Sequence, residues 1–148
     1  MAEDSSSQSN WTVILLAVGA GVLTAMQIGK VPPALPVIAE ELELSRVTAG
    51  LVASLFFVVG AVSGVAVGAM ADRFGERRLL YGGLLLLTLG SLIGGLTVET
   101  GILLGTRVIE GVGYIAIMVS APKIISDVAR SSDVPFAIGI WSTFMPLG

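Results

Sequence analysis

Cysteine and histidine are both absent from the 148 residues of this chain. Without cysteine, neither a disulfide framework nor a thiolate metal site can form. Without histidine, the chain lacks both the usual proton carrier near neutral pH and the commonest metal ligand. Charge is scarce as well, because Asp, Glu, Lys and Arg make up 13% of the chain, about half their share in soluble domains. The sequence therefore predicts no metal site and points toward a bilayer.

Long apolar segments dominate the chain, which is 54% hydrophobic and has a mean hydropathy of +0.92. A membrane-spanning helix needs ~20 mostly apolar residues. Segments of that length cover residues 11–38, 47–71, 79–98 and 101–125, and Ser45 is expected to cap the second of them. A further helix over residues 134–148 is too short to cross the ~30 Å apolar core. The expected fold is all-α, a polytopic membrane protein with four transmembrane helices and the start of a fifth.

The N-terminal residues, Met1 to Asn10, are acidic and rich in serine. They lack the basic start of a secretory signal, so we expect a disordered tail followed by a retained helix. Loops that are rich in Lys and Arg face the cytoplasm. The basic residues expected on the side of the tail are Arg73, Arg77, Arg78, Lys123 and Arg130, and those on the other side are Lys30 and Arg46. The sequence thus predicts an integral protein of the plasma (cell inner) membrane with a cytoplasmic N-terminus.

A short charged turn, Gly-Ala-Met-Ala-Asp-Arg-Phe-Gly-Glu-Arg-Arg, separates the second and third apolar segments. Gly75 permits a turn with positive φ. Asp72 ends the second segment, where a carboxylate can pair with arginine or accept hydrogen bonds from a helix N-terminus. The turn can therefore act as a latch that holds one conformation, and the residues expected to form it are Gly68, Asp72, Arg73, Gly75, Arg77 and Arg78. The simpler alternative is an ordinary basic loop with an incidental aspartate.

This turn resembles the signature loop between the second and third helices of the major facilitator superfamily, a large group of secondary membrane transporters. The family pattern is a glycine, four residues to an aspartate, a basic residue, an aromatic, a glycine and further basic residues. Two positions depart from it, because Glu76 stands where the family usually has Arg or Lys, and Met70 stands where leucine is common. Glu76 weakens the positive charge of the turn but leaves Arg77 and Arg78 in place.

Two charges, Arg107 and Glu110, interrupt the fourth apolar segment. They are three residues apart, so they share a helix face and can pair. Charges within the membrane cost ~2.5–3.5 kcal/mol each and usually face a cavity or a partner. The run from Arg107 to Gly113 resembles a second motif of the superfamily, in its fourth helix. The resemblance implies that Arg107 handles protons or anchors substrate and that Glu110 is a candidate proton carrier. The alternative is an ion pair that only orders the helix.

Lys30 lies near the outer end of the first segment, with Gln27 one turn before it. In the superfamily the first and fourth helices both line the central cavity. The resemblance therefore adds Gln27 and Lys30 to the substrate or proton path, and two cations, Lys30 and Arg107, would favour an anionic solute. Alternatively, Lys30 extends its long side chain to the outer membrane surface.

Glycines recur every four residues in three segments, a spacing that lets helices approach each other closely. The second segment has three such glycines, Gly60, Gly64 and Gly68. The third has Gly90 and Gly94, and the fourth has Gly101 and Gly105. The glycines expected to matter most for helix packing are Gly60, Gly64, Gly111 and Gly113. They can provide sliding surfaces for rocking motions or serve close packing alone.

Together, the two motifs imply the helical bundle of the N-terminal half of a superfamily transporter. Such transporters have two six-helix halves and bind solute between them. The resemblance implies alternating access driven by a proton or other ion gradient, with no enzyme activity and no cofactor. The expected partners are the lipid bilayer, a small solute, the coupling ion and the missing C-terminal half. No basic patch interleaved with aromatics suggests a nucleic-acid partner.

Two other functions remain open from the sequence. One is a small four-helix multidrug-type transporter that acts as a dimer, although the first apolar segment has no acidic residue and the chain continues beyond the fourth segment. The other is a membrane subunit that does not transport and assembles with partners through its glycines.

Overall fold

The computed structural model of the chain describes residues 8–148. Residues 1–7, which hold most of the predicted N-terminal tail, lie outside the described part. All regular elements within residues 8–148 are helices, which confirms the all-α class. They are α1 (Trp11–Gly29), α2 (Val31–Glu41), α3 (Arg46–Phe74), α4 (Glu76–Leu96), α5 (Thr100–Val128), α6 (Val134–Ser142) and α7 (Phe144–Leu147).

Four of the helical segments are long and apolar enough to cross a membrane, and α1 and α2 together form the first of them. Most of their ends extend beyond the apolar segments seen in the sequence, although α4 ends at Leu96, two residues before the expected end. The α3 helix begins at Arg46 and continues to Phe74, and α4 already begins at Glu76. Hydropathy marks only the apolar part of a helix, whereas charged residues at its ends can continue the helical hydrogen bonding.

The first span is divided at Lys30, within the apolar segment that the sequence predicted to reach residue 38. Pro32 and Pro33 follow directly. Proline has no amide hydrogen and cannot bond to the carbonyl four residues earlier. A separate helix therefore begins after Lys30, and this places the lysine at a junction between two helices.

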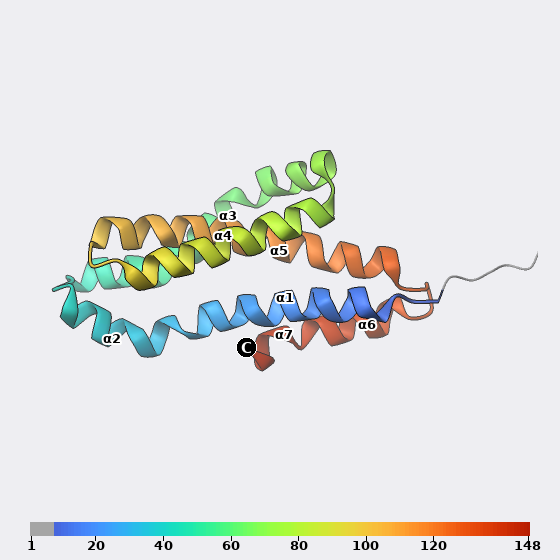
Figure 1. Cartoon of the computed structure of the whole chain (residues 1–148), viewed down its shortest axis with the longest axis horizontal. Helices are drawn as coiled ribbons and strands as arrows, with labels where there is room; N and C mark the ends of the chain where they lie inside the picture. The colour runs from blue at the N-terminus through green and yellow to red at the C-terminus, as the bar shows by residue number, and fades with distance from the viewer. Residues whose placement is uncertain (1–7) are drawn as a thin grey trace, which may run out of the picture.

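Figure 1 shows the long helices running side by side, with α3, α4 and α5 grouped on one side and α1, α2, α6 and α7 on the other. The α5 helix packs against α1, α3, α4 and α6, so it forms the centre of the bundle. The buried apolar core around it includes Ile14, Phe56, Ile117, Ile125 and Trp141. Side chains that project from the middle of α5 are therefore enclosed by other helices.

Residues 8–10 differ from the disordered tail that was predicted for residues 1–10. The side chain of Asn10 accepts a hydrogen bond from the Val13 amide at 3.2 Å and so caps α1. The Ser9 hydroxyl donates to Asp133 at 2.5 Å and accepts from the Arg130 amide at 2.9 Å. These bonds tie the start of α1 to the connection between α5 and α6.

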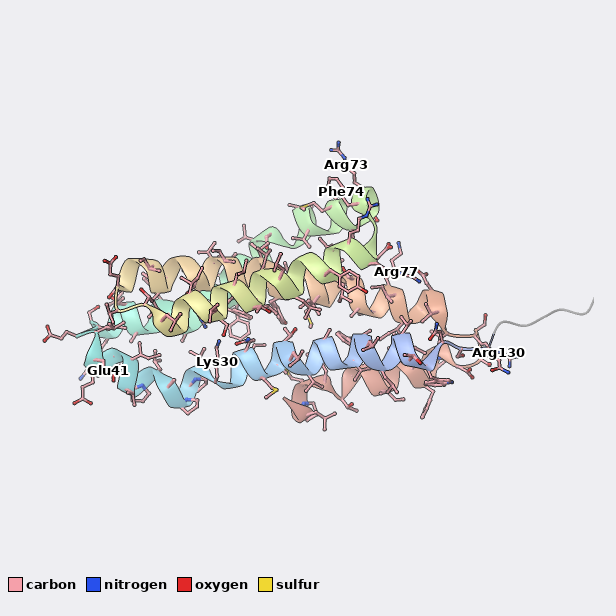
Figure 2. All side chains as sticks on the ribbon, in the orientation of Figure 1. Lys30, Glu41, Arg73, Phe74, Arg77 and Arg130 are labelled. Atoms are coloured by element: carbon pink, nitrogen blue, oxygen red, sulfur yellow. The ribbon has the colours of Figure 1, made fainter. Side chains whose placement is uncertain are left out.

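The basic residues of the turn lie at the same end of the bundle as this connection. Figure 2 shows Arg73, Arg77 and Arg130 toward one end and Glu41 at the opposite end. The turn and the connection between α5 and α6 therefore lie toward the same end of the bundle, whereas Lys30 lies between the two ends.

Candidate functional site: a buried charge cluster and a charged turn

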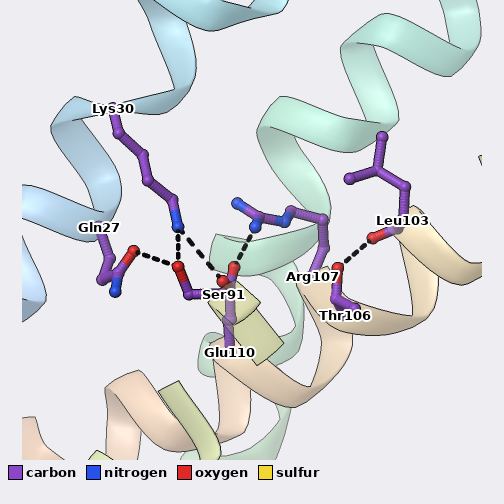
Figure 3. A network of polar contacts seen from close by, with 7 residues as sticks. All are labelled: Gln27, Lys30, Ser91, Leu103, Thr106, Arg107 and Glu110. Carbon is purple, nitrogen blue, oxygen red and sulfur yellow. Dashed lines mark hydrogen bonds and ion pairs between the residues drawn. The ribbon is translucent and has the colours of Figure 1, made fainter. Parts of the chain in front are cut away.

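The carboxylate of Glu110 lies in the middle of α5 and is fully buried. Arg107, one turn earlier on the same helix, places Nη2 2.5 Å from Glu110 Oε2. Lys30, at the junction of α1 and α2, places Nζ 3.5 Å from Glu110 Oε1. One carboxylate is thus shared by two cations from different parts of the chain (Figure 3).

Two polar side chains extend the cluster away from Glu110. The Lys30 ammonium donates a hydrogen bond to Ser91 Oγ at 2.6 Å, and Ser91 donates in turn to Gln27 Oε1 at 3.3 Å. Ser91 belongs to α4 and was missed in the sequence, where only its polarity within an apolar helix could have indicated it. Figure 3 shows that Gln27, Lys30, Arg107 and Glu110 meet around one point.

Glycines of α4 make room for this cluster. A Cβ atom at Gly90 would lie 2.6 Å from Cγ of Glu110, and one at Gly94 would lie 2.8 Å from Oγ1 of Thr106. Both distances are far below van der Waals contact. The side chain of Glu110 therefore fits between α4 and α5 because α4 presents no side chain there.

Other helix contacts also depend on glycine. A Cβ at Gly111 would lie 2.6 Å from the Phe56 carbonyl oxygen, and one at Gly113 would lie 2.8 Å from the Gly83 carbonyl oxygen. At Gly60 the nearest atom would be a ring carbon of Tyr114 at 3.3 Å. Gly64 has only an ordinary contact at 3.9 Å.

The close approach expected from the glycine spacing is not found at Gly68, Gly101 or Gly105, where a Cβ would meet no atom within 4 Å. These positions lie on faces that no described helix covers. Gly83 was not singled out in the sequence, because it has no glycine partner at a spacing of four. Spacing along one helix does not say which face meets a neighbour.

Most of the charged turn is helical, and the connection between α3 and α4 is a single residue. Gly75 ends α3 and precedes α4, with φ of 86° and ψ of 146°. The turn thus uses the positive φ that was expected of this glycine. Asp72 and Arg73 are exposed in the last turn of α3, and the Arg73 guanidinium lies 5.3 Å from the centre of the Phe74 ring.

Glu76, the residue that departs from the family pattern, has a partner in this structure. Its Oε1 lies 2.6 Å from Nζ of Lys123 on α5. The ion pair joins the first residue of α4 to the end of α5 that faces the turn. This pair could not be predicted from the sequence, because the two residues are far apart in the chain.

The structure separates the latch residues from the buried cluster. The turn lies at one end of the bundle (Figure 2), whereas Lys30, Arg107 and Glu110 meet within it (Figure 3). Among residues 8–148, no three His, Cys, Asp or Glu side chains gather closely enough to hold a metal ion. The side chains of the cluster itself, a carboxylate, an ammonium and a guanidinium, can pair charges and form hydrogen bonds.

Comparison with known proteins agrees with these features. The sequence model of the Major Facilitator Superfamily matches residues 16–148. Multidrug resistance protein 2 of Bacillus subtilis is 25% identical over 137 residues, which are 93% of this chain and 34% of the relative. The galactose-proton symporter of Escherichia coli K12 is 27% identical over 144 residues, which are 97% of this chain and 31% of the relative.

The chain therefore spans about a third of the length of these two relatives. The family match covers every described helix from within α1 to the end of α7. The matched family consists of transporters, not enzymes, and the apolar spans make the chain an integral membrane protein. On the family match, the chain belongs to the major facilitator superfamily.

Proposed function

We propose that this chain is the N-terminal portion of a secondary transporter that moves a small solute across the plasma membrane by alternating access. One relative is named for multidrug resistance and another for galactose–proton symport. The second name states transport directly, and the two names mention different compounds. The relatives therefore support the transport class and leave the solute to be argued from this chain's own residues.

The observation that carries the proposal is the buried carboxylate of Glu110 between Lys30 and Arg107. These two cations are the charged side chains that face Glu110 among the described residues. A buried acid that can be charged or neutral changes how strongly it holds both cations. We propose that Glu110 takes up and releases the coupling proton, so that protonation frees Lys30 and Arg107 for an anionic solute.

The charged turn supports the alternating-access part of the proposal. Asp72 is exposed and makes no ion pair within the described residues. It is therefore available to a group outside residues 8–148. We propose that this group belongs to the missing C-terminal half and that Asp72 latches the cytoplasmic side closed. The N-terminus then lies in the cytoplasm, on the side of Arg73, Arg77 and Arg130.

The coupling proposal is tested with the full-length protein in proteoliposomes. A panel of solutes is screened for uptake driven by an imposed proton gradient, and Glu110→Gln is compared with the wild type. We expect Glu110→Gln to abolish gradient-driven accumulation while solute exchange without a gradient continues. Glu99→Gln, at an exposed acid before α5, is the matched control and should behave as wild type. Unchanged pH-dependent uptake in Glu110→Gln would remove Glu110 from the proton path.

The length proposal has its own test. The present chain has a mass of 15.2 kDa, whereas a transporter with about twelve spans has a mass of roughly 40 kDa or more. The intact mass of the protein extracted from its native membrane distinguishes the two. A mass of 15.2 kDa would contradict a missing half, and stable co-purification of a partner without solute flux would then favour a non-transporting subunit.

The four-helix dimeric transporter receives no support from the comparisons, because the matched family is a different one. The first span also carries Lys30 in place of an acidic residue.

A further inference from the structure

The charges of the buried cluster do not balance. Lys30 and Arg107 each carry a positive charge, and Glu110 is the one acid that pairs with them in the described residues. An excess positive charge within the membrane is costly unless a partner neutralises it. The cluster therefore favours one additional negative charge, and it disfavours a cation.

The two cations are not equally available. The Arg107 side chain is 5% exposed and lies against Glu110, whereas the Lys30 side chain is 39% exposed. An ammonium has three donors. In this structure Lys30 donates to Ser91 and also lies 3.5 Å from Glu110 Oε1, which leaves one donor for a further partner. Nε of Arg107 is buried and has no hydrogen-bond partner among the described residues. Both cations thus retain donors that a bound anion could use.

Two cavities adjoin these donors. One has a volume of about 300 Å³ and is lined by Lys30, Ser91 and Arg107 together with apolar residues. The other has a volume of about 220 Å³, and Arg107 and Gln27 are its polar lining. Because Arg107, Val31 and Val52 line both, the two cavities meet at Arg107.

The walls of the second cavity are apolar and partly aromatic. Phe56 and Phe57 of α3 line it opposite Pro32 and Leu35 of α2. The centroids of the Phe56 and Tyr114 rings lie 5.1 Å apart, so Tyr114 packs against Phe56. An apolar group of a ligand would be well accommodated here, since binding sites combine apolar walls with a few polar groups that fix orientation.

From this arrangement we propose that the two cavities that meet at Arg107 together bind a small organic monoanion with an apolar body. The anionic group contacts Lys30, with Nε of Arg107 as the second donor, and the apolar body lies against Phe56 and Phe57. Ser91 and Gln27 position the Lys30 ammonium. This inference rests on the proposed transport function and adds the class of solute to it.

Binding is tested with the full-length protein in a non-ionic detergent, by isothermal titration calorimetry with four probes. Benzenesulfonate has both the charge and the apolar body, and methanesulfonate has the charge alone. Benzenesulfonamide is the neutral counterpart, and benzyltrimethylammonium is the cationic one. We expect benzenesulfonate to bind most tightly, methanesulfonate more weakly, and the neutral and cationic probes not to bind measurably. Binding of benzyltrimethylammonium in preference to benzenesulfonate, or binding of none of the probes, would overturn the proposal.

Three variants identify the site. Lys30→Gln should weaken benzenesulfonate binding by about ten-fold or more, as expected on losing a charged hydrogen bond. Lys30→Arg keeps the charge and should retain most of the affinity. Arg46→Gln removes an exposed cation at the start of α3 and should have no effect. Equal affinities in wild type and Lys30→Gln would place the anion elsewhere.

The outcome is distinguishable from failure of the transport proposal. Gradient-driven uptake that depends on Glu110, without benzenesulfonate binding, would retain proton-coupled transport and reject the organic-anion class. Benzenesulfonate binding that depends on Lys30, without any solute flux, would retain the anion site and reject transport.

Discussion

Glu76 and Lys123 join the charged turn to the central helix through a contact of 2.6 Å between Oε1 and Nζ. The pair links the first residue of α4 to α5 across the end of the bundle. Glu76, which departs from the family pattern, thus forms an ion pair with another helix. Because Glu76 directly follows Gly75, the contact lies beside the turn that Gly75 and Asp72 belong to.

Exchange of the two charges tests this link. Glu76→Lys and Lys123→Glu each place two like charges side by side, so each should lower the melting temperature. The double variant restores opposite charges and should melt closer to wild type than either single variant. The effect is small, because both groups are near the surface and salt screens them. Melting temperatures at low and high salt provide the measurement. If the double variant loses as much as the two single variants combined, the contact contributes nothing to stability.

Arg107→Met should destabilise the protein substantially. The substitution leaves the buried Glu110 with Lys30 as its remaining ion-pair partner. Removing one partner of a buried pair costs about 3–5 kcal/mol, and the remaining contact with Lys30 favours the lower end of that range. The free energy of unfolding in mixed micelles provides the measurement.

A second substitution separates charge from packing at this site. Arg107→Met combined with Glu110→Gln removes the unpaired acid, so the double variant should lose less than the sum of the two single variants. Arg46→Met, at an exposed position, is the control and should have little effect. A fully additive double variant would mean that the two side chains are not coupled.

Gly83→Ala should lower stability, whereas the neighbouring Gly82→Ala should not. A Cβ at Gly83 would lie 2.8 Å from the Gly113 carbonyl oxygen, and backbone cannot rotate away. At Gly82 no atom lies within 4 Å of such a Cβ. Overpacking typically costs about 1–3 kcal/mol. Unfolding measured for both variants decides the matter, and equal stabilities would mean that α4 and α5 can separate freely.

Gly75→Ala should strain the turn. A φ of 86° with ψ of 146° is close to a region that only glycine adopts readily, and such strain costs about 1–3 kcal/mol. Gly68→Ala, within α3 and facing open space, is the matched control and should be tolerated. Thermal melting of the two variants gives the comparison. If Gly75→Ala melts like Gly68→Ala, the turn is able to adopt another conformation.

Much of the architecture could be predicted from local patterns in the sequence. The apolar segments correspond to the long helices, and Ser45 caps α3 by accepting a hydrogen bond from the Thr48 amide at 3.1 Å. The pairing of Arg107 with Glu110 also follows from local spacing, because residues three apart lie on one helix face. These features depend on residues that are close together in the chain.

The rest of the site depends on contacts between distant parts of the chain. Ser91 receives the Lys30 hydrogen bond across 61 positions of the sequence, and its helix gave no sign of which face it presents. The sequence left open whether the first helix ends near Lys30 or continues to residue 38, because hydropathy continues across Lys30 while the prolines that follow interrupt the hydrogen bonding. Neither the register nor the rotation of neighbouring helices is written in the hydropathy pattern.

The sequence by itself determined the all-α class, the membrane-spanning segments, the charged turn and the family to which they point, because each depends on composition or short-range spacing. Only the tertiary structure decided that Lys30 and Arg107 share Glu110, that Glu76 pairs with Lys123, and that Gly83 rather than Gly68 lies in a close contact. The physical reason is that side-chain partners on different helices are set by helix rotation and register, which result from the packing of the whole bundle.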